Sequence, residues 1–366
     1  MSAVQGILEI GSRGGGHLRR REASYLPNGG DVSVPERVIR QYGLRTGDAV
    51  EGEVGRGRGT PPLERVLLVN ARPAESARDR RDFSRLVAIH PNELLRLECG
   101  LMRQGQPDQT NRVIDLLNPI GKGQRALIVA PAKAGKTTVL QAIAEGVSIN
   151  YPEAALLILL VDERPEEVFE MEAAGFGEVV ASSFDNPATQ HVAVAELVLE
   201  RARRRVELGL DVVLIMDSLT RLARAYNAAE KGSGKTLSGG LDSQAMEKPK
   251  RFFGSARRVN PADGGGSLTI IATALVDTGS KMDQLIFEEF KGTGNSELVL
   301  SRELADRRIF PAIDLVASGT RKEELLLSEP GLAASRVLRQ RMSRQTPIVA
   351  MNDLLVDLKR YKTNAE

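Results

Sequence analysis

Several residue types are scarce in this sequence, and each shortage excludes a class of protein. The 366 residues include a single cysteine, Cys99, so an internal disulfide is impossible. The longest unbroken apolar run, 154–161, is far shorter than the ~20 residues of a membrane-spanning helix. No basic segment followed by an apolar one opens the chain, which argues against a secretory signal. We therefore expect a soluble, cytoplasmic protein that does not contact a membrane.

Aromatic residues and net charge are also low. There is no tryptophan, aromatic residues make up 4% of the chain, and 50 basic against 48 acidic residues leave a net charge of +2. That balance is too even to indicate a nucleic-acid partner by itself. The shortage of aromatics matters because proteins that bind single-stranded nucleic acid usually stack bases on aromatic rings. With three histidines and one cysteine, no cluster has metal-ligand spacing.

The first part of the chain has the pattern of a small β-barrel. Short β segments are expected at 4–10, 31–34, 48–54 and 63–69, glycines at 14–16 interrupt the first of them, and a short helix is expected at 35–42. Several short strands at this spacing are typical of a barrel. We assign 1–72 to this domain and 73–117 to a connector, and we interpret the charge run at 78–82 as solvated surface.

The remainder, 118–366, is predicted to be an α/β domain that ends in a helical segment. Apolar runs at 127–129, 156–161, 179–180, 212–216 and 268–272 alternate with helical stretches, including an amphipathic one at 189–208. The runs are continuous, as expected of strands that are buried on both faces of a mostly parallel sheet.

Residues 130–137 match the phosphate-loop pattern, with alanine in place of the first glycine. They read Ala-Pro-Ala-Lys-Ala-Gly-Lys-Thr. In such a loop backbone N–H groups surround the β-phosphate, Lys136 reaches the β/γ oxygens and the Thr137 hydroxyl binds Mg²⁺. Residues 229–236 match the same relaxed pattern, but they follow a helical stretch and run into Leu-Ser-Gly-Gly, which does not begin a helix. We therefore place the phosphate loop at 130–137, between a strand and a helix.

Two carboxylate positions complete a predicted nucleotide site. Asp217 ends one apolar run, and Asp162 and Glu163 end another. In a parallel sheet these strand ends converge on the nucleotide crevice, where Asp217 supports Mg²⁺ and Glu163 can activate water. The alternative is that Asp162 or Glu163 only caps the turn before Pro165. Nucleotide hydrolysis is the leading hypothesis.

Longer strings carry a resemblance to a known family. They read Asp-Glu-Arg-Pro-Glu-Glu-Val at 162–168, Asp-Ser-Leu-Thr-Arg-Leu-Ala-Arg-Ala-Tyr-Asn at 217–227, Pro-Lys-Arg-Phe-Phe-Gly at 249–254, Asp-Thr-Gly-Ser-Lys-Met-Asp at 277–283, Glu-Glu-Phe-Lys-Gly-Thr-Gly-Asn at 288–295 and Ser-Gly-Thr-Arg-Lys-Glu-Glu-Leu at 318–325. These strings resemble the bacterial transcription termination factor Rho family. The barrel, with Leu-Arg-Thr-Gly-Asp at 44–48, is similar to that family's cold-shock-like (OB-fold) RNA-binding domain.

The resemblance implies an RNA-dependent ATPase that uses ATP and Mg²⁺. It implies a homo-hexameric ring of RecA-type P-loop domains that moves along single-stranded nascent RNA from 5′ to 3′ and releases it from RNA polymerase.

The resemblance also implies roles for individual residues. The nucleotide would be held by Lys133, Ala134, Gly135, Lys136, Thr137, Thr138 and Arg164, with Phe310 against the adenine. Thr137 and Asp217 would bind the metal, and catalysis would use Glu163, Lys136, Arg321 and Arg308. RNA would contact Arg19, Arg20, Lys235, Thr236, Ser238, Gly239 and Lys281. Arg321 would be an arginine finger for the neighbouring subunit, and Arg308 a second candidate. In the alternatives, Arg321 forms an ordinary surface ion pair and Phe310 belongs to the core.

The barrel departs from the family where RNA bases would stack. The family's glycine-rich turn carries phenylalanines, whereas this chain has three glycines at 14–16, and Ser33 stands where an aromatic is common. We expect weak RNA binding by the barrel, without a strong cytosine preference. Two other functions stay open: an RNA-binding hexamer that acts as regulator or scaffold without efficient termination, and a rotary- or secretion-type ATPase subunit.

Overall fold

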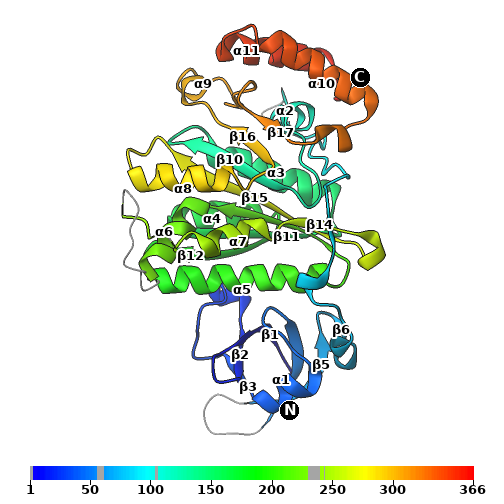
Figure 1. Cartoon of the computed structure of the whole chain (residues 1–366), viewed down its shortest axis with the longest axis vertical. Helices are drawn as coiled ribbons and strands as arrows, with labels where there is room; N and C mark the ends of the chain where they lie inside the picture. The colour runs from blue at the N-terminus through cyan, green and yellow to red at the C-terminus, as the bar shows by residue number, and fades with distance from the viewer. Residues whose placement is uncertain (1–2, 56–61, 104–105, 230–239, 243) are drawn as a thin grey trace.

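Figure 1 shows the computed structural model, in which a small β-domain, a central α/β domain and a pair of C-terminal helices follow one another along the long axis. The structure describes residues 3–55, 62–103, 106–229, 240–242 and 244–366. None of the helices within these ranges is long and apolar enough to cross a membrane.

The small domain is a curled antiparallel sheet with the strand order β3-β2-β1-β4-β5-β6. A bridge between Ser33 and Pro62 brings the β3 edge back toward β5, so the predicted barrel is confirmed. Its interior consists of alternate strand residues such as Leu8, Leu18 and Val50. Its elements are β1 (Ala3–Ile10), β2 (Gly16–Arg19), β3 (Val32–Val34), α1 (Glu36–Tyr42), β4 (Ala49–Val54), β5 (Leu63–Val69) and β6 (Arg72–Pro73).

Two strands of this sheet, β2 and the short β6, were not predicted. The glycines at 14–16 end in a strand, β2, which pairs with β1 from Gly16 opposite Ile10 to Arg19 opposite Ile7. A side chain at Gly16 would bring its Cβ to 2.6 Å from the carbonyl oxygen of Glu9. The glycine therefore permits close approach of the two strands instead of interrupting them.

The central domain contains the predicted parallel sheet. Strands β12-β11-β13-β15-β10-β16 lie side by side and parallel, and β17 is added antiparallel at the β16 edge. All five predicted apolar runs lie in these strands. The bounds are β10 (Arg125–Pro131), β11 (Ala155–Glu163), β12 (Glu178–Ser183), β13 (Asp211–Asp217), β14 (Arg257–Val259), β15 (Ser267–Val276), β16 (Ser296–Val299) and β17 (Gly319–Thr320).

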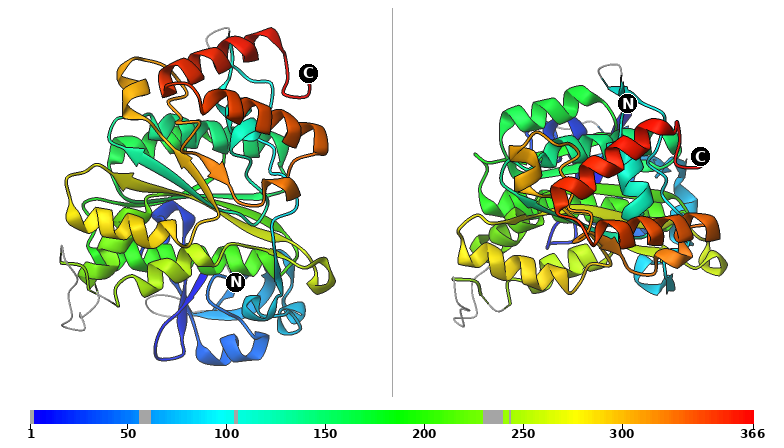
Figure 2. Two further views of the ribbon diagram at one scale, coloured as in Figure 1. Left: turned by 45° about the horizontal axis from the view of Figure 1, so that its top comes forward. Right: turned by 90° about the horizontal axis from the view of Figure 1, so that it is seen from above.

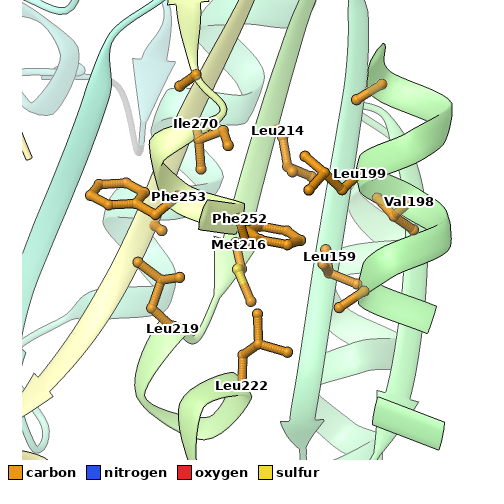
Figure 3. Close-up of a cluster of buried hydrophobic side chains, with 14 of the residues drawn as sticks. Leu159, Val198, Leu199, Leu214, Met216, Leu219, Leu222, Phe252, Phe253 and Ile270 are labelled. Atoms are coloured by element: carbon orange, nitrogen blue, oxygen red, sulfur yellow. The ribbon is translucent and has the colours of Figure 1, made fainter. Parts of the chain in front are cut away.

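Helices cover both faces of the sheet and create two apolar cores (Figure 2). Along β13, Leu214 and Met216 face one core while Val213 and Ile215 face the other, which explains the continuous apolar runs. Figure 3 shows the first core, where Leu159 and Leu214 of the sheet meet Leu199 of α5. The helices are α2 (Thr110–Leu117), α3 (Lys136–Asn150), α4 (Pro165–Ala174), α5 (Ala188–Val206), α6 (Leu219–Ala229), α7 (Glu247–Gly254), α8 (Lys281–Lys291), α9 (Arg302–Asp306), α10 (Glu329–Met342) and α11 (Pro347–Arg360).

The barrel is docked directly on helix α5 (Figure 1). Gly47 has φ +90°, and a Cβ there would lie 2.4 Å from the backbone carbon of Glu200 in α5. Ile7 and Tyr25 of the barrel belong to the first core of the central domain. The two domains therefore share packed surface.

The charge run at 78–82 is not simply solvated surface, contrary to our interpretation. The Arg80 side chain is 4% exposed and pairs with Asp48 of the barrel, with Glu207 at 3.9 Å beyond the end of α5. A guanidinium between two buried carboxylates joins both domains to this segment. The sequence around Arg80 did not reveal this because both partners are distant in the chain.

The segment at 73–117 also contributes strands and a helix. β7 (Ala88–Ile89) pairs with β14, β8 (Met102–Arg103) pairs with β9 (Gln106–Pro107), and α2 packs on α3. At the other end of the chain, α10 and α11 form the predicted helical segment, with Leu354 and Leu358 buried.

Candidate nucleotide-binding site

The loop at 130–137 has the conformation that a phosphate loop requires. β10 ends at Pro131, and α3 begins at Lys136. Lys133 and Gly135, with φ +62° and +86°, turn the chain between them. The first N–H groups of α3 have no carbonyl partner within the helix, and such a helix start after a loop is where phosphate groups bind. Ala134 is buried, Thr137 is half-buried, and Lys133 and Thr138 are exposed.

Lys136 meets both predicted carboxylates at the ends of the neighbouring strands. Its Nζ lies 2.7 Å from an oxygen of Asp217 and 3.5 Å from Glu163. Burial opposes the charge on Lys136, but Asp217 and Glu163 outweigh it and raise the pKa of the amine. Asp217 is fixed in turn by the hydroxyl of Thr273, which donates to it at 2.6 Å. The three predicted residues therefore form one cluster.

Glu163 has the electrostatics of a general base. Its pKa is raised to about 7, first by burial and then by the charge of Asp217, while Lys136 and Arg221 act in the opposite direction. A carboxylate with a pKa near the working pH is well matched to accepting a proton from water. Capping of the turn before Pro165 does not account for this burial and charge.

Three carboxylates at this point suit a divalent cation. Oxygens of Glu163, Glu167 and Asp217 lie within 4.8 Å of one another. Carboxylate and hydroxyl oxygens are the donors that Mg²⁺ prefers. Glu167 was missing from the predicted ligands, although its position four residues after Glu163, at the start of α4, was a usable signal.

Arg221 is a second residue that the sequence analysis did not assign. Its Nε lies 3.0 Å from Glu163, and its Nη1 lies 3.0 Å from Asp162. Beyond Asp162, buried His191 exchanges a 2.7 Å hydrogen bond with Ser182. Arg221 stands within the quoted string at 217–227, but the pairing that gives it a role depends on the tertiary fold.

Phe310 lies over the phosphate loop. Its ring carbon Cε1 would be 3.5 Å from a Cβ at Gly135, and the side chain is 48% exposed. This exposure is contrary to the core alternative and leaves a ring face open beside the loop. Arg308 is exposed on the same segment, with φ +59°, and Arg164 is exposed at the start of α4.

Arg321 lies at the opposite end of the sheet from its own phosphate loop. Its backbone N–H donates to Asn295, whose N–H donates to Arg125 at the start of β10. Pro131 is six residues farther along that strand, about 20 Å at the usual rise. The Arg321 side chain makes no ion pair with any residue that the structure describes, including Glu323 and Glu324, so the surface-pair alternative finds no support.

The predicted RNA contacts are distributed over the barrel and the loops. Arg19 is 13% exposed and already pairs with Glu9 and Asp31, whereas Arg20 is exposed. Lys281 is exposed at the first turn of α8, beside a cavity of about 430 Å³. The predicted contacts Lys235, Thr236, Ser238 and Gly239 lie outside the described residues, as does most of the second match to the phosphate-loop pattern.

A groove of about 420 Å³ lies on the barrel face that includes Ser33 and residues of the glycine-rich turn, where the family commonly has aromatic side chains. His17 and Ser33 lie opposite each other on β2 and β3. The residues that line the groove are Gly11, Ser12, Arg13, Gly15, Gly16, His17, Ser33, Val34 and Pro35, and none of these described residues is Phe, Tyr or Trp. The surface offers no aromatic platform of the usual kind.

Fold and site together define a RecA-type P-loop ATPase that carries a small β-barrel. Residues 110–320 match the nucleotide-binding domain of the ATP synthase alpha/beta family, and residues 4–75 match the RNA-binding domain of Rho termination factor. This chain belongs to the transcription termination factor Rho family.

Relatives named transcription termination factor Rho match almost the whole chain. The protein of Cereibacter sphaeroides is 50% identical over 99% of this chain and 85% of its own length. That of Haemophilus influenzae is 52% identical over 99% of this chain and 86% of its own. That of Gemmatimonas aurantiaca is 58% identical over 94% of this chain, which spans about half (47%) of that relative.

Among solved structures, a prototypical ATPase from the type III secretion system of pathogenic bacteria is similar to this fold. It has a TM-score of 0.60 and 25% identity, over 80% of this chain and 78% of that one. The match to an RNA-binding domain, together with the Rho relatives, decides against the secretion-type alternative.

Proposed function

We propose that this protein is a cytoplasmic, homo-hexameric motor that hydrolyses ATP to move 5′ to 3′ along nascent RNA and release it from RNA polymerase. The observation that carries the proposal is the contact of Lys136 with both Glu163 and Asp217 beneath a phosphate loop, in a chain with a Rho-type RNA-binding domain. The Lys136 contacts support ATP hydrolysis, and the RNA-binding domain supports RNA as the polymer along which the motor moves.

In this proposal, Lys136 and the loop amides bind the β- and γ-phosphates of ATP, and Phe310 stacks on the adenine. Thr137 and Asp217, with Glu167 near, would hold Mg²⁺, which neutralises charge on the transferring phosphoryl group. Glu163 orients the attacking water and accepts its proton. Arg221 contacts the same oxygen of Glu163 as Lys136 does and is a positioning residue.

Arg321 acts on the neighbouring subunit's nucleotide. Its own phosphate loop lies about 20 Å farther along β10, which is beyond the reach of an arginine side chain and supports a role at the neighbouring subunit. An arginine supplied across an interface stabilises phosphoryl charge and makes hydrolysis depend on assembly. This requirement supports a ring with head-to-tail contacts between subunits. Arg308 is assigned to the same interface.

RNA passes the ring at the segment that includes Lys281, and it also contacts Lys235, Thr236, Ser238 and Gly239, which lie outside the described residues. Lysines in these places contact phosphates without reading bases. Arg20, rather than the ion-paired Arg19, would make the first contact of RNA with the barrel, because its side chain is exposed.

The test is phosphate release from ATP with and without RNA homopolymers, with Lys136→Ala as the blank. We expect strong stimulation by RNA that is lost in the blank. Hydrolysis that ignores RNA would contradict the proposal.

One observation favours a second function, a regulatory or scaffold hexamer without efficient termination. The barrel groove has no aromatic side chain among its described residues, so RNA capture there is expected to be weak. RNA binding without hydrolysis in the same assay would favour this function.

A further inference from the structure

A second cavity lies between the barrel and the central domain, away from the phosphate loop. It has a volume of about 490 Å³ and is formed by β1, β2 and β4 of the barrel, the first residue of β12 and the end of α5. In Figure 1 the barrel lies beneath α5, and the elements that form the cavity meet at this junction. Five arginines line it: Arg19, Arg20, Arg21, Arg201 and Arg205.

Three of the five guanidinium groups already have partners within the protein. Arg19 pairs with Glu9 and Asp31, and Arg20 donates to the carbonyl of Gly30. Arg201 pairs with Glu178 and contacts the hydroxyl of Tyr25. Among these contacts, that of Arg201 with Tyr25 joins the two domains, and the others lie within one domain.

Arg21 and Arg205 differ from the others, because neither side chain forms a hydrogen bond or ion pair with any residue that the structure describes. Burial and then the charge of Arg201 lower the pKa of the Arg205 guanidinium, so this group is in an unfavourable environment for a cation. The charge of Glu178 attracts Arg205 but does not outweigh burial and Arg201, so an added anion would stabilise this guanidinium group.

The balance of charge in the cavity also favours binding of an anion. Burial raises the pKa of Glu178, but Arg201, the Tyr25 hydroxyl and Arg21 outweigh it and lower the pKa. Arg205 also attracts this carboxylate, so the charges of three guanidinium groups act on Glu178, and one of them, that of Arg201, pairs with it directly. Besides Glu178, the only acidic groups among the described lining residues are Glu22 and Glu51, against five arginines.

We propose that this cavity binds phosphate groups, with Arg21 and Arg205 as the contacts, and that RNA leaving the barrel supplies them. Guanidinium groups are the side chains best matched to phosphate oxygens. Arg20 and Arg21 follow β2 of the RNA-binding domain, and both line the cavity, so an RNA strand that contacts Arg20 would continue into it. The proposal goes beyond the nucleotide site and the RNA contacts assigned to Lys235 and Lys281, and its RNA source rests on the proposed RNA binding by the barrel.

The test compares the double variant Arg21→Gln/Arg205→Gln with Arg40→Gln, whose side chain is 79% exposed on α1. Binding of a fluorescent single-stranded RNA is measured over a range of salt. Each lost phosphate contact lowers the slope of log affinity against log salt by about 0.7 on single strands, so we expect a fall of about 1.4. We expect the affinity itself to fall at least tenfold at about 0.15 M salt, since charge-assisted hydrogen bonds are lost. Arg40→Gln should change neither quantity.

A second arm separates RNA from a free phosphate compound. Inorganic tripolyphosphate is titrated against Lys136→Ala protein, in which the phosphate loop is disabled, with and without the two glutamine substitutions. A fall in RNA affinity supports RNA as the source. Tripolyphosphate binding that the substitutions abolish, with RNA affinity unchanged, supports a phosphate site but overturns RNA as its ligand. No change in either measurement, with an unchanged melting temperature, overturns the proposal, and intact RNA-stimulated hydrolysis would then show that the proposed function stands without it.

Discussion

Replacement of Arg80 is the sharpest test of how the two domains are joined. The guanidinium is 4% exposed, and both of its carboxylate partners, Asp48 and Glu207, have fully buried side chains. Arg80→Met keeps most of the apolar stem but leaves two buried carboxylates without this cation. Removing one partner of a buried ion pair costs roughly 3–5 kcal/mol of unfolding free energy.

This cost converts into a measurable shift in melting temperature. Unfolding entropy is about 2.1 cal/mol/K per residue, so over the 366-residue chain we expect the melting temperature to fall by about 4–6.5 °C. Arg40→Met is the matched control, because Arg40 is exposed and its pair with Glu36 spans four residues of one helix. Such a pair contributes about 0.3–0.5 kcal/mol, so its loss should barely move the melting temperature.

A double variant separates the ion pair from simple loss of packing. Arg80→Met leaves the buried charge of Asp48 without its partner, and Asp48→Asn removes that charge. The combined variant should therefore be more stable than Arg80→Met by itself. Calorimetry on the three proteins checks this. If Arg80→Met were no less stable than Arg40→Met, the buried-charge reasoning would be refuted.

The remaining predictions concern the site and its RNA. Because the pKa of Glu163 is about 7, the fraction of its unprotonated, basic form increases as the pH rises through 7, and kcat/KM should rise with it. Glu163→Gln should lose nearly all activity. A rate independent of pH in this range would contradict the assignment of Glu163 as the base. Arg321→Ala should lower kcat about 10³-fold or more. When Arg321→Ala and Lys136→Ala subunits are mixed, roughly one quarter of the interfaces combine an intact Lys136 with a neighbour's intact Arg321, and hydrolysis should return at these interfaces. Mixtures that stay inactive although mixed rings form would contradict a contribution across the interface. Filter binding at about 0.15 M salt should show weak RNA binding with little difference between oligo-C and oligo-A, and tight C-selective binding would refute the account of the barrel.

The parallel sheet and the position of the nucleotide site could be predicted because local sequence determines them. The continuous apolar run at 156–161 fits a strand buried on both faces, and β11 is such a strand. The strand before 130–137 and the helix after it separate the phosphate loop from the second match at 229–236. Lys136, Glu163 and Asp217 meet because parallel strands end at the same edge.

The features that were missed depend on contacts between distant residues. β2 was hidden because its first residue is a glycine that permits close approach to β1, and glycine is also the commonest signal of a turn. The burial of Arg80 and the contact of Arg221 with Glu163 join segments far apart in the chain. The resemblance suggested Arg321 as an arginine finger, but only the sheet topology places it far from its own phosphate loop.

The central claim is that ATP hydrolysis drives release of RNA from the polymerase, and it is tested most directly on stalled elongation complexes. The protein is added to complexes that carry a labelled transcript, with ATP or without it, and the released RNA is measured. The account predicts ATP-dependent release that Lys136→Ala abolishes. Transcripts that stay bound while RNA-stimulated hydrolysis proceeds would contradict it.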